Sequence, residues 1–168
     1  FVADRRINDK GPAIIINNLV AGGFTFENYS TARKQMMAFC DATGEPLELT
    51  PDMLIVGPKH EESARAMLEN ETISIGGVAV SNPYRNSTVK LLVSGRFIGA
   101  YEDHFRLLCN NRGVKAVVVQ KVMESGLIRK DNVTDDNVFH DDEAQYGVKY
   151  IGAAGPGMPQ MCVAGIPA

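Results

Sequence analysis

Three cysteines and three histidines are the side chains of this sequence best suited to nucleophilic catalysis or to binding a transition metal. A catalytic thiol needs a base within hydrogen-bond reach, and a zinc site needs ligands at short, regular spacings. The six residues are far apart and form no CxxC, HxxxH or HExxH pattern. They are Cys40, Cys109, Cys162, His60, His104 and His140. We therefore predict buried structural thiols, no catalytic residue, and no metal or cofactor site.

A hydrolase is the alternative from a catalytic class, and it would pair Cys109 or Cys162 with His104 or His140. The sequence has neither a GxSxG elbow nor a GxxxxGK[ST] phosphate loop. The glycine-rich residues 152–157 do not precede a helical pattern, so we interpret them as a turn rather than a phosphate cradle. The only candidate catalytic residues for a hydrolase in the sequence are thus these widely separated cysteine–histidine pairs.

The composition is that of an ordinary globular protein with a slight acidic excess. The net charge of −3 gives the chain no basic field for nucleic acid or anionic lipid. Its longest apolar runs fall far short of the roughly 20 residues that cross a bilayer, so we predict no membrane span. The odd number of separated cysteines suits a reducing cytoplasm.

Residues 131–143 form an acidic run with six Asp or Glu and no Lys or Arg. Without these six residues the rest of the chain has a net charge near +3. His140 lies within the run, but the spacing of a calcium hand is absent. We therefore predict an exposed, solvated acidic loop.

The elements that would position these residues start with one long amphipathic helix over residues 25–40. Thr25 is a suitable N-cap with Glu27 in the first turn, and Gly44 ends the pattern. Apolar residues recur every three or four positions and predict one buried face. They are Phe26, Tyr29, Ala32, Met36, Met37 and Cys40.

A shorter helix and several strands follow, so the expected fold class is α+β. We predict the second helix at 61–69, with Ala64, Met67 and Leu68 on its apolar face. Strands at 73–80 and 88–94 should be antiparallel neighbours, and the Val-rich strand at 115–122 should be buried on both faces. Strands at 145–151 and 160–164 should pair across residues 152–157. The other predicted strands are 53–56 and 105–108.

Several short blocks in this order carry a family resemblance. They are DATGEPL at 41–47, PDMLIVGP at 51–58, ESAR at 62–65, NPYRNSTVKLLV at 82–93, DNVF at 136–139 and YGV at 146–148. Their order and spacing resemble the Mu-like phage (prophage) major head subunit, a tailed-phage major capsid protein. Where that family commonly has an Arg soon after the YGV block, this chain has Lys149, Tyr150 and Ile151.

The resemblance implies a Hong Kong 97-like phage capsid fold, in which a peripheral domain with a long spine helix carries an inserted axial domain. Residues 1–23 would be the returning end of an extended loop or arm, with the N-terminal arm and most of that loop missing. Residues 24–58 and 136–168 would form the peripheral lobe, and residues 59–135 the axial lobe. The last two strands would then pair with the strand at 53–56.

The function implied is structural. The protein would self-assemble into pentamers and hexamers of an icosahedral phage shell enclosing DNA, with scaffolding, portal and decoration proteins as further partners and only non-specific contact with DNA. It would be assembled in the bacterial host cytoplasm and reside in the virion, and the acidic run would face a basic neighbour or the outer surface. The alternatives are a nanocompartment shell protein and a monomeric virion accessory domain whose acidic loop binds a basic partner.

Overall fold

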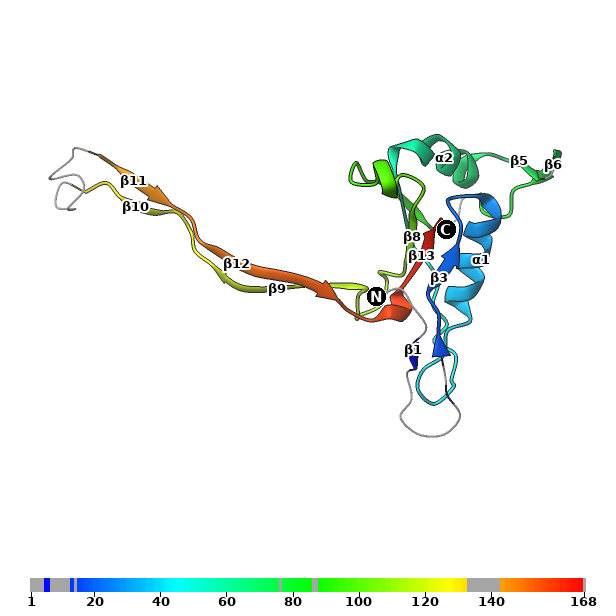
Figure 1. Ribbon diagram of the computed structural model, residues 1–168, viewed down its shortest axis with the longest axis horizontal. Helices are drawn as coiled ribbons and strands as arrows, with labels where there is room; N and C mark the ends of the chain where they lie inside the picture. Colours follow the sequence, from blue (N-terminus) through cyan, green and yellow to red (C-terminus); the bar gives the residue numbers. More distant parts are fainter. Residues whose placement is uncertain are drawn as a thin grey trace. The chain divides into compact units, whose positions relative to one another are not determined.

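The computed structural model describes residues 5–6, 13, 15–75, 77–85, 88–132 and 143–167. The chain divides into two units, Phe1–Ala116 with Pro156–Ala168, and Val117–Gly155. We call them the sheet unit and the ribbon unit, and most of their strands and helices are labelled in Figure 1. The mixture of few helices and many strands confirms the predicted α+β class.

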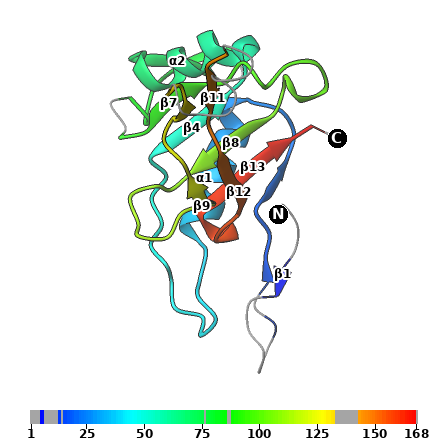
Figure 2. The same ribbon diagram turned by 90° about the vertical axis from the view of Figure 1, so that its left-hand side faces the viewer.

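The sheet unit is built on a five-stranded mixed sheet in the order β3-β13-β8-β4-β7 (Figure 2). Strand β13 is parallel to β3 and antiparallel to β8, whereas β4 is antiparallel to β8 and parallel to β7. A parallel neighbour requires a crossover connection, and the segment that contains α2 joins β4 to β7. The strands are β3 (Leu19–Ala21), β4 (Met53–Val56), β7 (Lys90–Val93), β8 (Phe105–Leu108) and β13 (Cys162–Ile166).

Among its described residues, the sheet unit also contains two helices, three 3-10 turns and two short strand pairs. Helix α1 packs against β13 and β3, and α2 contacts β7. They are α1 (Phe26–Met37), α2 (Glu61–Glu69), η1 (Pro58–His60), η2 (Gly99–Tyr101), η3 (Pro159–Met161), β1 (Arg5–Arg6), β2 (Ile15–Ile16), β5 (Thr72–Ile75) and β6 (Val78–Ser81). The ribbon unit contains β9 (Val117–Glu124), β10 (Ile128–Lys130), β11 (Gln145–Gly147) and β12 (Tyr150–Pro156), whose last residue belongs to the sheet unit.

Helix α1 confirms the predicted helix, its N-cap and most of its buried face. The Thr25 hydroxyl accepts a hydrogen bond from the backbone N–H of Asn28 at 3.1 Å, which satisfies one of the free N–H groups at the helix start. Tyr29, Ala32 and Met36 are fully buried. The prediction was wrong at the C-terminal end, because the helix stops at Met37. Cys40 therefore lies beyond the helix, in a bridge with Pro46, and Met37 is 49% exposed.

The core lies on the central strands, where alternate side chains point into the same layer. Leu54 of β4 is opposite Leu107 of β8, and both side chains are fully buried. Strand β13 is covered at each of its first four residues. Helix α2 buries Ala64, Met67 and Leu68 as predicted. The hydrophobic layer between the helices and the sheet is what holds the sheet unit together.

Two predicted strand pairings on the sheet unit were wrong. The segment at 73–80 is a hairpin of β5 and β6, because Gly77 has a φ of +83° and turns the chain between them. Strand β7 pairs with β4 instead of with this hairpin. Strand β13 lies in the same sheet as β4, but β8 separates them, so the expected pairing of the last strand with 53–56 was also wrong.

The Val-rich strand and the last two predicted strands also differ from expectation. All eight residues of β9 are exposed, so the predicted burial on both faces was wrong. Residues 145–151 contribute to β11 and β12, which pair with β10 and β9, and not with the strand at 160–164. Residues 152–156, expected to be a flexible turn, belong to β12. The amino-acid preferences correctly predicted that these segments form strands. They do not predict which strand each one pairs with, or whether another layer of the protein buries it.

The sheet draws strands from both of the predicted lobes, since β4 and β13 come from the peripheral ranges and β7 and β8 from residues 59–135. The part of residues 1–23 that contains β3 is an edge strand of this sheet. Strand β10 directly precedes the acidic run, but residues 133–142 of that run lie outside the described residues. The division into peripheral and axial lobes and the exposure of the whole acidic run therefore stay predictions.

Asn82, which lies outside α2, caps the C-terminal end of this helix through side-chain hydrogen bonds that the sequence did not predict. Its side-chain amide donates to the carbonyls of Met67 at 2.7 Å and Asn70 at 2.8 Å, and its side-chain oxygen accepts from the N–H of Tyr84. The side chain is 7% exposed. These bonds satisfy carbonyls that the last turn of a helix leaves free.

We expect Asn82→Ala to lower the free energy of unfolding by about 2 kcal/mol, because it leaves a buried carbonyl without a donor. Urea denaturation followed by circular dichroism measures the change. Asn70→Ala, at an exposed neighbouring position, is the control and should change stability by less than about 0.5 kcal/mol. Equal effects of the two substitutions would contradict the capping role of Asn82.

Candidate assembly surface

The ribbon unit consists of two antiparallel strand pairs in succession. Strand β9 pairs with β12, and β10 pairs with β11 in a register that places Arg129 opposite Tyr146. Between the two pairs, Ser125 and Lys149 are joined by three hydrogen bonds. The Ser125 N–H donates to the Lys149 carbonyl at 2.9 Å, the Ser125 hydroxyl donates to the same carbonyl, and the Lys149 N–H donates to the Ser125 hydroxyl. Backbone pairing therefore continues through the junction.

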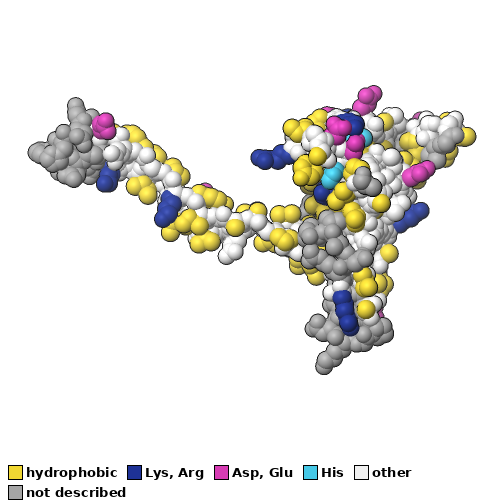
Figure 3. Space-filling model, viewed as in Figure 1, with side chains coloured by type: hydrophobic (Ala, Val, Ile, Leu, Met, Phe, Trp, Pro, Cys, Tyr) yellow, Lys and Arg dark blue, Asp and Glu magenta, His cyan; other side chains and the backbone are white. Residues whose placement is uncertain are grey.

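Large apolar side chains of the ribbon unit are exposed to solvent. Every residue of β9, β10 and β11 is exposed, and hydrophobic side chains run along these strands in Figure 3. Their exposed fractions range from 43% to 71%, which is high for large apolar side chains in a folded protein. They are Val117, Val118, Val119, Val122, Met123, Leu127, Ile128, Tyr146, Val148, Tyr150 and Ile151.

A two-stranded ribbon with this much exposed apolar surface is not expected to be stable in water without a partner. A two-stranded ribbon by itself is marginally stable in water, and contiguous exposed apolar surface marks a site of association. The ion pairs between Lys121 and Glu124 and between Arg129 and Asp131 stay within the ribbon unit and cover little of this surface. We identify the strands of the ribbon unit as the candidate assembly surface.

Two of the three cysteines lie where the prediction placed them relative to the strands, with Cys109 just after β8 and Cys162 as the first residue of β13. Both are buried, and the Cys109 thiol donates to the Asn111 side-chain oxygen at 3.0 Å. Burial raises the pKa of Cys162 to about 11. Burial also raises the pKa of Cys109, with the Asp52 carboxylate adding to the effect. A thiol with a raised pKa is a poor nucleophile.

The histidines do not meet these thiols in the described part of the chain. His104 precedes β8 and Cys109 follows it, so the strand holds them about 16 Å apart at the usual rise per residue. Cys162 is opposite Leu108, at the same far end of β8 as Cys109. His140 lies outside the described residues. The pairs Cys109–His104 and Cys162–His104 are thus not assembled by the fold.

His60 has a structural contact instead. Its Nε2 lies 2.8 Å from Asp103 Oδ1, and Lys59 Nζ lies 2.8 Å from the same oxygen and 2.7 Å from Glu102 Oε1. The hydrogen bonds from Lys59 and then His60 hold the pKa of Asp103 below its usual value. This cluster fastens η1 to the segment that follows η2.

At pH 7.5, we expect an alkylating reagent to modify Cys40 and to leave Cys162 and Cys109 unmodified. Cys40 is partly exposed, whereas the two others are buried. With a pKa of about 11, Cys162 stays almost entirely protonated at this pH, and its thiolate fraction grows only as the pH approaches 11. Mass spectrometry of the intact and peptide-digested protein locates the label. Rapid labelling of Cys162 in native protein would show that the strand opens, and labelling in denaturant is the positive control.

Metal ligands do not cluster in the part of the chain that the structure describes. No group of three or more His, Cys, Asp or Glu side chains among those residues could hold a metal ion. Glu143, at the end of the acidic run, is exposed, and so is Asp131 at its start. Among the described residues, no helix is long and apolar enough to cross a membrane.

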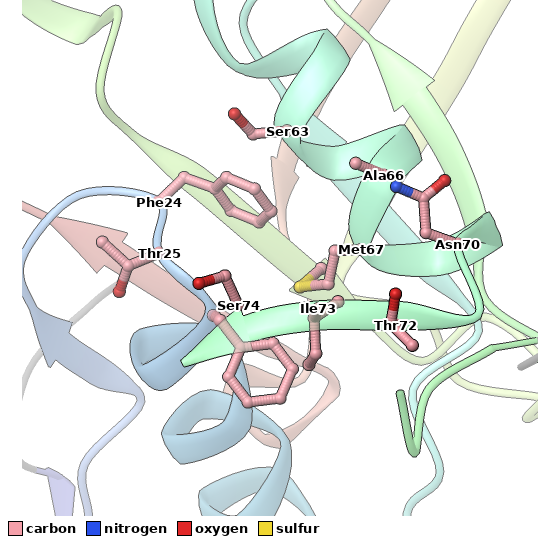
Figure 4. Close-up of a pocket in the computed structure, with 10 residues that line it drawn as sticks. Phe24, Thr25, Ser63, Ala66, Met67, Asn70, Thr72, Ile73 and Ser74 are labelled. Carbon is pink, nitrogen blue, oxygen red and sulfur yellow. The ribbon is translucent and has the colours of Figure 1, made fainter. Parts of the chain in front are cut away.

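A recess lies in the sheet unit between the start of α1, helix α2 and β5. It has a volume of about 400 Å³, and none of the described side chains that line it is charged. Phe24 and Met67 point into it from opposite sides, with Ile73 on the β5 side (Figure 4). Such a lining suits an apolar side chain better than a charged ligand.

The exposed apolar ribbon was missed by sequence reasoning, which placed the same valines in the core. One signal was present in the sequence. Val117, Val118 and Val119 are consecutive, so they must fall on both faces of a strand. The structure adds that the partner strand is β12, whose residues 152–155 are only Gly and Ala. A strand of this kind has no bulky partner within its own ribbon.

The described candidate residues thus comprise two buried thiols, a salt-bridged histidine and the exposed apolar strands of the ribbon unit. The sequence model of one family, the Mu-like prophage major head subunit gpT, matches residues 19–98 and 93–166. Because these regions cover most of the chain, the protein belongs to the Mu-like prophage major head subunit family, whose members are structural capsid proteins of the virion. A search of curated proteins found no match.

Proposed function

We propose that this protein self-assembles into pentamers and hexamers of an icosahedral phage shell that encloses DNA. The observation that carries the proposal is the exposed apolar surface of the ribbon unit in a member of a major head subunit family. Contacts between different patches of identical subunits close into rings when the rotation is right, and such rings are the units of a shell.

The proposal includes the fold and the partners expected for such a shell. The sheet unit and its helices would correspond to lobes of a Hong Kong 97-like subunit, with α1 as the spine helix. Scaffolding, portal and decoration proteins would be further partners, and contacts with packaged DNA would be non-specific. We assign no catalytic role, because the Cys109 and Cys162 thiols are buried and His104 lies at the opposite end of β8 from both of them.

Negative-stain microscopy and light scattering of the full-length gene product that contains this sequence test the proposal. We expect rings of five or six subunits, tubes or closed shells, in the presence of a scaffolding protein if one is encoded beside the gene. A matched sample in low concentrations of guanidinium gives the dissociated subunit for comparison. Persistent monomers at every salt concentration, with the scaffolding protein supplied, would contradict self-assembly and favour a binding domain.

A further inference from the structure

The exposed apolar residues of β9 lie on both faces of the ribbon unit. Side chains of a strand alternate between its faces, so Val117, Val119 and Met123 share one face, and Val118 and Val122 share the other. Their exposed fractions are 55%, 65% and 46% on the first face and 50% and 66% on the second. Neither face of β9 is therefore the polar, solvent-facing side that a half-buried antiparallel strand normally has.

The polar residues of β9 are not confined to one face, so they do not make one face polar and the other apolar. Gln120 and Glu124 share a face with Val122, and Lys121 shares the face of Val119. An element that lies on a neighbour by one face needs apolar residues on that face alone. Two apolar faces require cover on both sides.

The distribution of charge favours another copy of this chain as the cover. The ribbon unit carries 4 of the 17 basic and 7 of the 20 acidic residues, so the sheet unit has equal numbers of each. Within the ribbon unit, six of the seven acidic residues fall in residues 131–143, and the rest of the unit carries four basic residues and one acidic residue. Each ribbon unit is thus acidic in one stretch and basic in another, which makes it complementary to a second copy of itself.

We propose that, in the assembled head, both faces of β9 are covered by other copies of this chain. This inference rests on the proposed function, because a free subunit has no copies with which to cover the ribbon unit. Val119 on one face and Val122 on the other become buried on assembly, and the ribbon unit lies between neighbouring subunits.

Lysine substitutions on each face test the proposal in the full-length protein. Val119→Lys and Val122→Lys each place a charge in a buried contact, and we expect each to raise the critical concentration for assembly by more than about tenfold. Val119→Ile and Val122→Ile keep the apolar character and the β-branched shape, and these controls should assemble like the wild type. Sedimentation and electron microscopy measure assembly.

The outcomes separate the inference from the proposed function. If the wild type forms no heads, the proposed function fails and the inference fails with it. If the wild type forms heads and the lysine variants assemble equally well, the inference alone is overturned. An effect at only one of the two positions overturns the claim that both faces are covered.

Hydrogen exchange of the wild type tests the same proposal without a substitution, so it still applies if a lysine variant fails to fold. The amides of β9 should exchange at least about tenfold more slowly in heads than in dissociated subunits, because opening a covered ribbon requires a neighbour to move away. The amides of β8, which are buried in the subunit itself, should differ much less. Equal exchange of β9 in heads and subunits would overturn the inference without any substitution.

Discussion

Gly165→Ala is expected to lower the free energy of unfolding by about 3 kcal/mol. Gly165 of β13 is opposite Phe105 of β8, and a Cβ atom added at Gly165 would fall inside the Phe105 ring, 2.6 Å from its Cζ. The ring cannot move easily, because it is fully buried and packs edge-on against Phe24 with a centroid distance of 5.6 Å. Overpacking of this kind forces side chains from their rotamers and shifts the backbone.

Urea denaturation of Gly165→Ala, with Gly95→Ala as the control, measures this effect. Gly95 has no atom within 4 Å of an added Cβ, so the control should change stability by less than about 1 kcal/mol. A combined Gly165→Ala and Phe105→Leu variant should recover part of the loss, because the smaller side chain makes room. A stability equal to the wild type in the single variant would show that Phe105 has another rotamer available.

Asn18→Ala is expected to cost about 3 kcal/mol of the free energy of unfolding. The fully buried side-chain amide donates to the carbonyls of Pro159 at 3.2 Å and Cys162 at 3.1 Å, and the backbone carbonyl of Asn18 accepts from Ala164. These bonds attach the start of β3 to the start of β13. Alanine leaves the buried Cys162 carbonyl without this donor, at about 1 to 3 kcal/mol for a buried unsatisfied group, whereas the part-buried Pro159 carbonyl still accepts from the Cys162 N–H.

The adjacent Asn17 is a matched control for this prediction. Its side chain is exposed and accepts one local hydrogen bond, from the N–H of Leu19 at 2.8 Å. Asn17→Ala should therefore cost less than about 1 kcal/mol in the same denaturation experiment. Asn18→Asp keeps the shape but removes the donating amide, and it should be at least as unstable as Asn18→Ala. Similar losses at positions 17 and 18 would show that β3 is held mainly by its backbone pairing.

The local elements were predictable from the sequence because their signals lie within a few residues of each other. Thr25 and the spacing of Tyr29, Ala32 and Met36 specify α1, since a cap and one helical face are local properties. The run at 53–56, bounded by proline and glycine, specified β4 in the same way. The short sequence blocks that resemble the Mu-like major head subunit were also local, and the family that they predicted was confirmed.

Strand partners and burial were decided only by the tertiary structure. Pairing joins residues far apart in the chain, so nothing near Cys162 in the sequence indicates that Leu19–Ala21 and Phe105–Leu108 flank its strand. The valines of β9 have the same strand propensity whether a layer covers them or not. Composition therefore identified β9 as a strand, and only the fold showed that all eight of its residues are exposed.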